Sequence, residues 1–126
     1  MDILLKRAYE APEPSDGFRI LVDRLWPRGV SKNSAHIDLW LKDIAPSTPL
    51  RKWFGHDPSR WIEFRDRYFL ELRSNPEAVE QLKVHVRRGL VTFVYGAKDK
   101  EHSHAVVLKE YLGNTIRLRR RYPYGI

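Results

Sequence analysis

Residues 90–113, LVTFVYGAKDKEHSHAVVLKEYLG, pass from an apolar strand through a polar corner into a capped helix. Leu90 to Tyr95 is a short run of β-branched, aromatic and aliphatic residues, which is typical of a strand covered on both faces. Apolar residues then recur at helical spacing as far as Gly113, where we expect the helix to end. The stretch therefore predicts a central strand followed by a helix, the basic unit of an α/β protein.

The corner between this strand and this helix is crowded with charged and imidazole side chains. It contains Lys98, Asp99, Glu101, His102 and His104. In open α/β sheets, ligands bind outside the carboxyl ends of the strands. We therefore expect a ligand site at this corner, with Ser103 or Asp99 capping the helix that follows.

Composition limits the class of protein. A chain of 126 residues with 42% hydrophobic residues is long enough for one folded domain and too short for two ordinary ones. The sequence contains no cysteine, which excludes disulfides, thiolate metal sites and cysteine nucleophiles. It shows neither a signal-peptide pattern nor an apolar run of membrane-spanning length. We therefore expect a cytoplasmic protein with no membrane partner.

The positive charge is concentrated at the end of the chain. The formal net charge is +7, and Arg117, Arg119, Arg120 and Arg121 supply four of these charges with no acidic residue among the last ten. Residues 1–116 thus carry only +3. This distribution predicts a single α/β domain over residues 1–116 and a basic C-terminal tail over residues 117–126, with an anionic partner for one or both.

Two more strands and four more helices are predicted between the termini. The strands are residues 3–9 and 18–23, separated by a loop rich in proline and glycine. The helices are predicted from apolar spacing and from Ser, Asp, Asn, Pro and Gly signals at their ends: residues 37–44, 48–54, 58–72 and 76–88. Residues 114–121 alternate weakly, which leaves two interpretations, an edge strand or an unpaired arm.

The order of these elements favours one fold class. Two strands come first, then several helices, then the strand at 90–95 and the last helix. Helices separate the strands at 18–23 and 90–95, so these two strands are predicted to pair in parallel. We expect an α/β single-domain sandwich with a small, mostly parallel central sheet flanked by helices.

Three runs of this sequence resemble a known family. They are DGFRILVDRLWPRG, WLKDIAPSTPLRKWFGHDPSRWIEFRDRY and VTFVYGAKDKEHSHAVVLKEYL, and they are similar to the YeaO-like family of uncharacterised proteins, also called domain of unknown function 488. The resemblance implies a cytoplasmic bacterial or archaeal α/β domain. The family has no established activity, so the resemblance implies no catalytic residues. The chain has Ser103 where the family has Asn, and Gly96 where the family usually has Ala.

Cationic side chains follow two of the predicted strands. Arg24 and Arg28 come after the strand at 18–23, and Lys98 with Asp99 comes after the strand at 90–95. If both strand ends face one crevice, these cations and the free N–H groups of the last helix, including that of Ser103, form an anion clamp. The alternative is a structural ion-pair network that joins the two strand ends.

The histidines and one tryptophan complete the candidate site. His104, assisted by Asp99, is a candidate for acid/base catalysis, with helix capping as the alternative. On a helix, His102 and His104 lie about 200° apart around the axis and cannot bind one ion, whereas in an extended loop they could point the same way. A lone His-x-His pair is a weak metal signal, so we predict no metal. We also expect no cofactor. Trp26 lies between Arg24 and Pro27, where it either contacts a ligand or packs as part of a lid.

Two functions are compatible with these residues. The first is binding of a phosphate-bearing ligand, either a nucleotide or a nucleic-acid end, at the carboxyl ends of the strands. The alternative is a non-enzymatic module that holds nucleic acid through its basic surface and Arg-rich tail. The sequence contains no glycine-rich phosphate loop and assigns no reaction, so whether the protein is an enzyme stays open.

Overall fold

A four-stranded sheet forms the centre of the protein. The structure is a computed structural model that describes residues 2–121, with side chains described for residues 2–114. The strands are β1 (Ile3–Arg7), β2 (Phe18–Leu21), β3 (Leu39–Trp40) and β4 (Val91–Tyr95), in the order β1-β4-β2-β3. All three strand pairings are parallel. The α/β class and the parallel pairing of the strands predicted at 18–23 and 90–95 are therefore confirmed.

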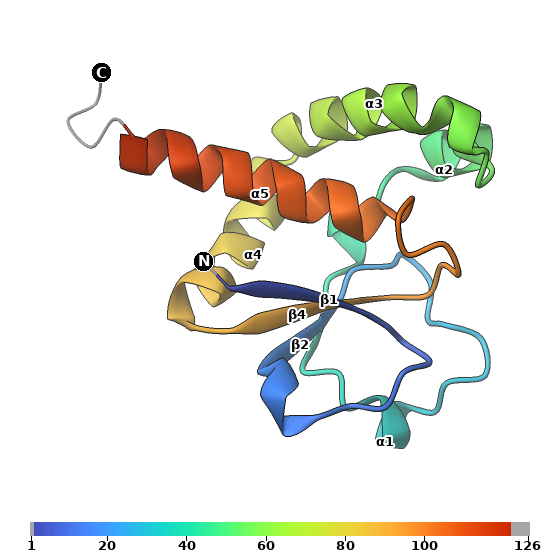
Figure 1. The fold of residues 1–126 in the computed structure, drawn as a ribbon, viewed down its shortest axis with the longest axis vertical. Helices are drawn as coiled ribbons and strands as arrows, with labels where there is room; N and C mark the ends of the chain where they lie inside the picture. The colour runs from blue at the N-terminus through green and yellow to red at the C-terminus, as the bar shows by residue number, and fades with distance from the viewer. Residues whose placement is uncertain (1, 122–126) are drawn as a thin grey trace.

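Helices cover mainly one face of this sheet. The α-helices are α1 (Lys32–Ala35), α2 (Thr48–Phe54), α3 (Trp61–Arg73), α4 (Pro76–Arg88) and α5 (His104–Arg121). Short 3-10 turns are η1 (Pro14–Asp16), η2 (Lys42–Ile44) and η3 (Pro58–Arg60). Figure 1 shows α3, α4 and α5 on one side of the sheet and α1 on the other. No helix within residues 2–121 has both the length and the hydrophobicity needed to cross a membrane.

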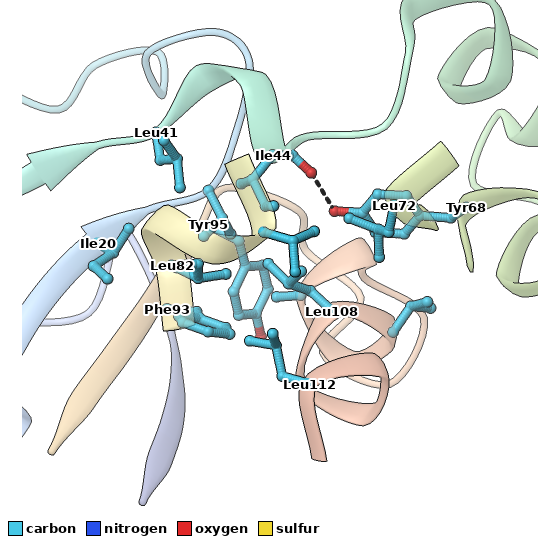
Figure 2. Close-up of a cluster of buried hydrophobic side chains, with 14 of the residues drawn as sticks. Ile20, Leu41, Ile44, Tyr68, Leu72, Leu82, Phe93, Tyr95, Leu108 and Leu112 are labelled. Carbon is cyan, nitrogen blue, oxygen red and sulfur yellow. Dashed lines mark hydrogen bonds between the residues drawn. The ribbon is translucent and has the colours of Figure 1, made fainter. Parts of the chain in front are cut away.

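The main hydrophobic core lies between β4 and these helices. Phe93 of β4 and Leu108 of α5 are fully buried, and Tyr68 of α3 is 1% exposed (Figure 2). Val94 and Leu21 point to the other face, where Trp26 and Trp40 pack against them. All five residues of β4 are buried because both faces of the sheet are covered, which explains the continuous apolar run in the sequence.

A buried ion network supports the second face of the sheet. The Arg19 side chain is almost fully buried and donates from Nη1 to Asp16 Oδ2 over 2.6 Å and from Nη2 to the carbonyl of Ala35 over 3.0 Å. Lys6 Nζ lies 3.1 Å from Asp16 Oδ1. Burial by itself raises the pKa of Asp16, but the Glu13 N–H, Lys6 and Arg19 outweigh burial and lower it. Each charge therefore has a partner, which fits a structural role.

Sequence signals placed three helices correctly. Ser47 caps α2 by accepting a hydrogen bond from the Leu50 N–H, and Gly55 ends α2 with φ 53°. The predicted apolar stripe of α3 is buried at Phe64, Tyr68 and Leu72. The helix predicted at 76–88 is α4, which stops before Gly89 as expected. Helix ends are readable here because capping depends on short-range contacts.

The helix predicted at residues 37–44 is wrong. Leu39 and Trp40 form β3 beside β2, and the Asp38 N–H donates to the Arg19 carbonyl over 2.9 Å. The Leu41 N–H donates to the Leu21 carbonyl over 3.0 Å. The apolar residues in this short stretch fit both a helical and an alternating spacing. Pairing with β2 decides between the two patterns. This contact joins residues that are far apart in the sequence, so the spacing within residues 37–44 does not reveal it.

The predicted end of the last helix is also wrong. The α5 helix continues past Gly113 to Arg121, so residues 114–121 form neither an edge strand nor an unpaired arm. A glycine inside a helix costs about 1 kcal/mol, which good helix formers such as Leu and Arg on either side can offset. The predicted boundary between residues 116 and 117 falls inside α5. Residues 122–126 of the predicted tail lie outside the described residues.

Candidate functional site

A cavity of about 310 Å³ opens beside the carboxyl ends of β2 and β4. Most of its lining comes from residues 23–27 after β2, the end of α2 with the turn after it, residues 96–97 after β4, and the start of α5. These segments meet because β2 and β4 are neighbours in the sheet and run in the same direction. Their charged and imidazole lining consists of Asp23, Arg24, Arg51, His56, His102 and His104. The cavity therefore occupies the position at which α/β folds bind ligands.

Asp23 and His104 connect the end of β2 with the segment after β4 and with the start of α5. Asp23 Oδ2 accepts a hydrogen bond from the Gly96 N–H over 2.9 Å, and Asp23 Oδ1 lies 3.3 Å from His104 Nε2. The same Nε2 lies 3.0 Å from the Val22 carbonyl oxygen. Both neighbours of Nε2 are acceptors, so this nitrogen carries the ring hydrogen. His104 thereby ties the start of α5 to the end of β2.

The Asp23 carboxylate is largely shielded from water. Burial raises its pKa, while His104, the Gly96 N–H and Arg51 act in the opposite direction without cancelling the effect of burial. A Cβ atom added at Gly96 would lie 3.0 Å from Asp23 Oδ2, so glycine leaves this carboxylate more room than alanine would. Among the described residues of the cavity lining, Asp23 is the one acidic residue.

The two arginines of the cavity lie in different settings. Arg24 donates from Nη2 to the Ala45 carbonyl over 3.1 Å, while its buried Nε atom has no hydrogen-bond partner among the described residues. Arg51 on α2 is exposed to solvent and acts on Asp23 through its charge. One guanidinium is thus hydrogen-bonded in the wall, and the other belongs to an exposed residue at the rim.

The opposite part of the lining is apolar. Trp26 donates from Nε1 to the Val30 carbonyl over 2.6 Å and packs edge to face on Trp40, with ring centroids 5.4 Å apart. Trp40 in turn donates from Nε1 to the Asp23 carbonyl over 2.8 Å. These bonds hold the Trp26 ring in place without a ligand, so this wall of the cavity is preformed.

Four of the seven site residues predicted from the sequence line the cavity. They are Arg24, Trp26, Ser103 and His104. Ser103 is buried, and within the described residues no backbone N–H of α5 donates to its hydroxyl, so the predicted capping of α5 by the Ser103 side chain is wrong. Whether these four bind a ligand stays a prediction.

The other three predicted residues lie outside the cavity lining. Arg28 and Lys98 are exposed. Asp99 accepts hydrogen bonds from the backbone of Glu101 and His102, and its Oδ2 lies 2.8 Å from His102 Nδ1. These bonds lower the pKa of Asp99, and the His102 side chain is the largest cause. The carboxylate in contact with His104 is therefore Asp23 and not Asp99.

Sequence reasoning did not select three of the residues found here. Asp23 follows β2 directly, and a charged residue at the end of a buried strand was the available signal. Arg51 and His56 belong to α2 and the turn after it, and no local pattern connects them to the strand ends. Within the part of the chain that the structure describes, no group of three His, Cys, Asp or Glu residues is arranged to hold a metal ion.

Comparison with known proteins gives a family and several relatives. The family described as "Inactive DUF488-N3 subclade" matches residues 2–122. "Uncharacterized protein YeaO" of Escherichia coli is 42% identical over 112 residues, which cover 89% of this chain and 97% of that protein. "Uncharacterized protein Rv3073c" of Mycobacterium tuberculosis is 41% identical over 110 residues, covering 87% of this chain and 92% of that protein. No solved structure matches the chain.

Proposed function

The chain belongs to the inactive DUF488-N3 subclade, and we propose that it binds a phosphate-bearing ligand in the cavity at the carboxyl ends of β2 and β4 without transforming it. The observation that carries this proposal is the charge of the lining. Arg24 and Arg51 contribute two permanent positive charges, against one carboxylate among the described lining residues, that of Asp23. A cavity of this kind attracts anions.

The start of α5 adds donors to this positive lining. Ser103 and His104 line the cavity at the amino end of an 18-residue helix. The first N–H groups of a helix have no acceptor within the helix, and its dipole favours a negative charge there. Phosphate accepts several such hydrogen bonds at once, and Arg side chains add charge-assisted bonds to it. Helix and arginines thus favour the same class of ligand.

The contacts around the predicted catalytic pair limit its use in catalysis. His104 Nε2 faces the Val22 carbonyl and Asp23, which leaves Nδ1 as the nitrogen that could accept a proton. Asp99 does not assist it, because Asp99 bonds to the backbone of Glu101 and to His102. The family description "inactive" points in the same direction. The predicted catalytic pair His104 and Asp99 is therefore not carried into the proposal.

Calorimetric titration with inorganic phosphate and with AMP tests the proposal. The variant Arg51→Gln removes one charge from the cavity rim, and Arg88→Gln is the matched control, because Arg88 is equally exposed but lies at the end of α4, next to the amino end of β4. A charge-assisted hydrogen bond contributes about 1.5–3 kcal/mol, so Arg51→Gln should weaken binding by about 10- to 100-fold. Equal affinities for the two variants, or no binding by the wild type, would rule out the proposal.

A second candidate function rests on the course of α5. The helix continues through Arg117, Arg119, Arg120 and Arg121, so the arginine cluster extends a helix anchored in the core. We propose as the alternative that this basic helix end holds nucleic acid through its phosphates. Removing residues 117–126 should then lower the magnitude of the salt dependence, d log K/d log[salt], by up to about three or four. Equal slopes for the full chain and for the chain without residues 117–126 would exclude this function.

The cytoplasmic location stays a prediction.

A further inference from the structure

Two large apolar side chains stand exposed at the mouth of the cavity. Leu25 is 62% exposed and Tyr9 is 51% exposed, and both line the cavity. Leu25 belongs to a loop, where a small polar residue would serve the fold as well. Apolar surface at the rim of a pocket is typical of a binding site, because a ligand removes it from water. The mouth therefore provides an apolar contact that phosphate alone cannot use.

The hydrogen bonds of this apolar side fix its position. Tyr9 donates from its hydroxyl to the Arg28 carbonyl over 2.9 Å, and the Arg7 guanidinium lies 5.0 Å from the centre of the Tyr9 ring. Arg7 also donates from Nε to the carbonyl of Ala97, a residue of the lining. Because Arg7 contacts the face of the Tyr9 ring and the Arg28 carbonyl holds its hydroxyl, the ring loses little conformational freedom when a ligand binds. The apolar side of the cavity can thus contact a planar or apolar group.

Most of the cationic and imidazole groups lie on other segments of the lining. Arg51 comes from α2, His56 from the turn after it and His104 from the start of α5, whereas Arg24 shares the loop after β2 with Leu25 and Trp26. A ligand that satisfies both parts needs an anionic group joined to an apolar ring system. The volume of about 310 Å³ is close to the lower limit of roughly 300 Å³ for small-molecule pockets, which suits one nucleotide and no longer polymer.

We propose that the ligand is a mononucleotide, with its phosphate on Arg24 and Arg51 and its base against Leu25, Tyr9 and Trp26. This inference rests on the proposed function and names the class of its ligand. Bases stack on aromatic and apolar side chains, and a mononucleotide carries a base and a phosphate on one ribose. A sugar phosphate would use the arginines but leave Leu25 and Tyr9 in water. The contribution of the base is therefore the quantity to measure.

The experiment compares AMP, GMP, CMP and UMP with ribose 5-phosphate and inorganic phosphate, by calorimetric titration of the full chain. The variant Leu25→Ala removes apolar contact at the mouth. Leu70→Ala is the matched control, because Leu70 is 58% exposed on α3 and is not part of this cavity. Leu25→Ala should weaken binding of at least one nucleotide by about five- to tenfold and leave ribose 5-phosphate unchanged. Arg51→Gln should weaken both kinds of ligand.

The outcomes separate this inference from the proposed function. If ribose 5-phosphate binds as tightly as every nucleotide, or if Leu25→Ala affects both to the same extent, the mononucleotide is excluded while phosphate binding stands. If none of the six compounds binds the wild-type chain, both ideas fail together. We expect the wild type to bind one nucleotide at least about tenfold more tightly than ribose 5-phosphate. Leu25→Ala should reduce this preference by about five- to tenfold, and Leu70→Ala should keep it.

Discussion

Tyr68→Phe removes one hydroxyl group from beneath the candidate site. Tyr68 is 1% exposed, and its hydroxyl donates to the Ile44 carbonyl over 2.6 Å (Figure 2). Ile44 is itself fully buried, so its carbonyl is not in contact with bulk water and has Tyr68 as its side-chain donor. Burial raises the pKa of Tyr68 well above its usual value, which keeps the hydroxyl protonated and able to donate at any pH at which the protein folds. The substitution keeps the aromatic ring in place and changes only this hydrogen bond.

The expected cost follows from leaving a buried acceptor unsatisfied. Such a loss costs about 1–3 kcal/mol of unfolding free energy. For a chain of this size, each kcal/mol corresponds to about 4 °C, so the Tm should fall by about 4–12 °C. The contact between the Tyr68 ring and the His104 ring, with centroids 6.1 Å apart, does not involve the hydroxyl. Ligand binding well below the Tm should therefore change less than about twofold.

Urea denaturation followed by circular dichroism measures this cost, and Tyr9→Phe is the matched control. Tyr9 also donates its hydroxyl to a backbone carbonyl, that of Arg28, but its side chain is half exposed and water can take over the bond. Tyr9→Phe should therefore cost less than about 0.5 kcal/mol. The reasoning is refuted if Tyr68→Phe costs no more than Tyr9→Phe, because burial of the acceptor would then make no difference.

Two further predictions concern Asp23 and the glycine at the start of β2. Burial raises the pKa of Asp23 above its unfolded value of 3.8, so the folded state binds the carboxyl proton more tightly than the unfolded state does. The contribution of Asp23 to the unfolding free energy should therefore fall as the pH rises from about 4 through the raised pKa. The unfolding free energy of the wild type minus that of Asp23→Asn, measured in urea from pH 4 to 7, should decrease with pH; an increase would show a carboxylate of lowered pKa. Gly17 has φ 66°, and a Cβ there would lie 2.4 Å from the Leu90 carbonyl oxygen, whereas Gly29 has φ 80° and open space around it. In thermal unfolding, Gly17→Ala should cost at least about 3 kcal/mol and Gly29→Ala about 1–2 kcal/mol of unfolding free energy. Similar costs for the two variants would mean that a shift of the backbone relieves the close approach to Leu90.

The parts of the fold that were predictable depend on short-range chemistry. Ser47 and Gly55 mark the ends of α2 because capping is settled within a few residues. The strand β4 was recognisable because burial on both faces requires a continuous apolar run. By contrast, β3 exists because of its pairing with β2, a contact that the spacing of Leu39 and Trp40 does not encode. The extension of α5 beyond Gly113 likewise overrode the local preference of glycine.

The candidate site was predictable in position but only partly in composition. Parallel strands bring their carboxyl ends to one edge, so Arg24 and His104 were expected near each other, and both line the cavity. Two acids follow the two strands, and the sequence does not tell which one is buried. Asp99 turns back to the backbone of its own loop, while Asp23 reaches Gly96 and His104. Arg51 lines the cavity because of the way α2 packs, and only the tertiary structure defines that packing.

The most direct measurement is an NMR titration of the isotope-labelled chain with AMP. The proposed site predicts shifts at the backbone amides of Gly96, Ala97 and Ser103 and at the indole N–H of Trp26, since all four residues line the cavity. The indole N–H of Trp53 serves as an internal reference, because Trp53 lies on α2 away from the cavity lining. Saturable shifts confined to the cavity residues are the predicted result. Shifts limited to residues 115–121, or none at all, would contradict a ligand site at the carboxyl ends of β2 and β4.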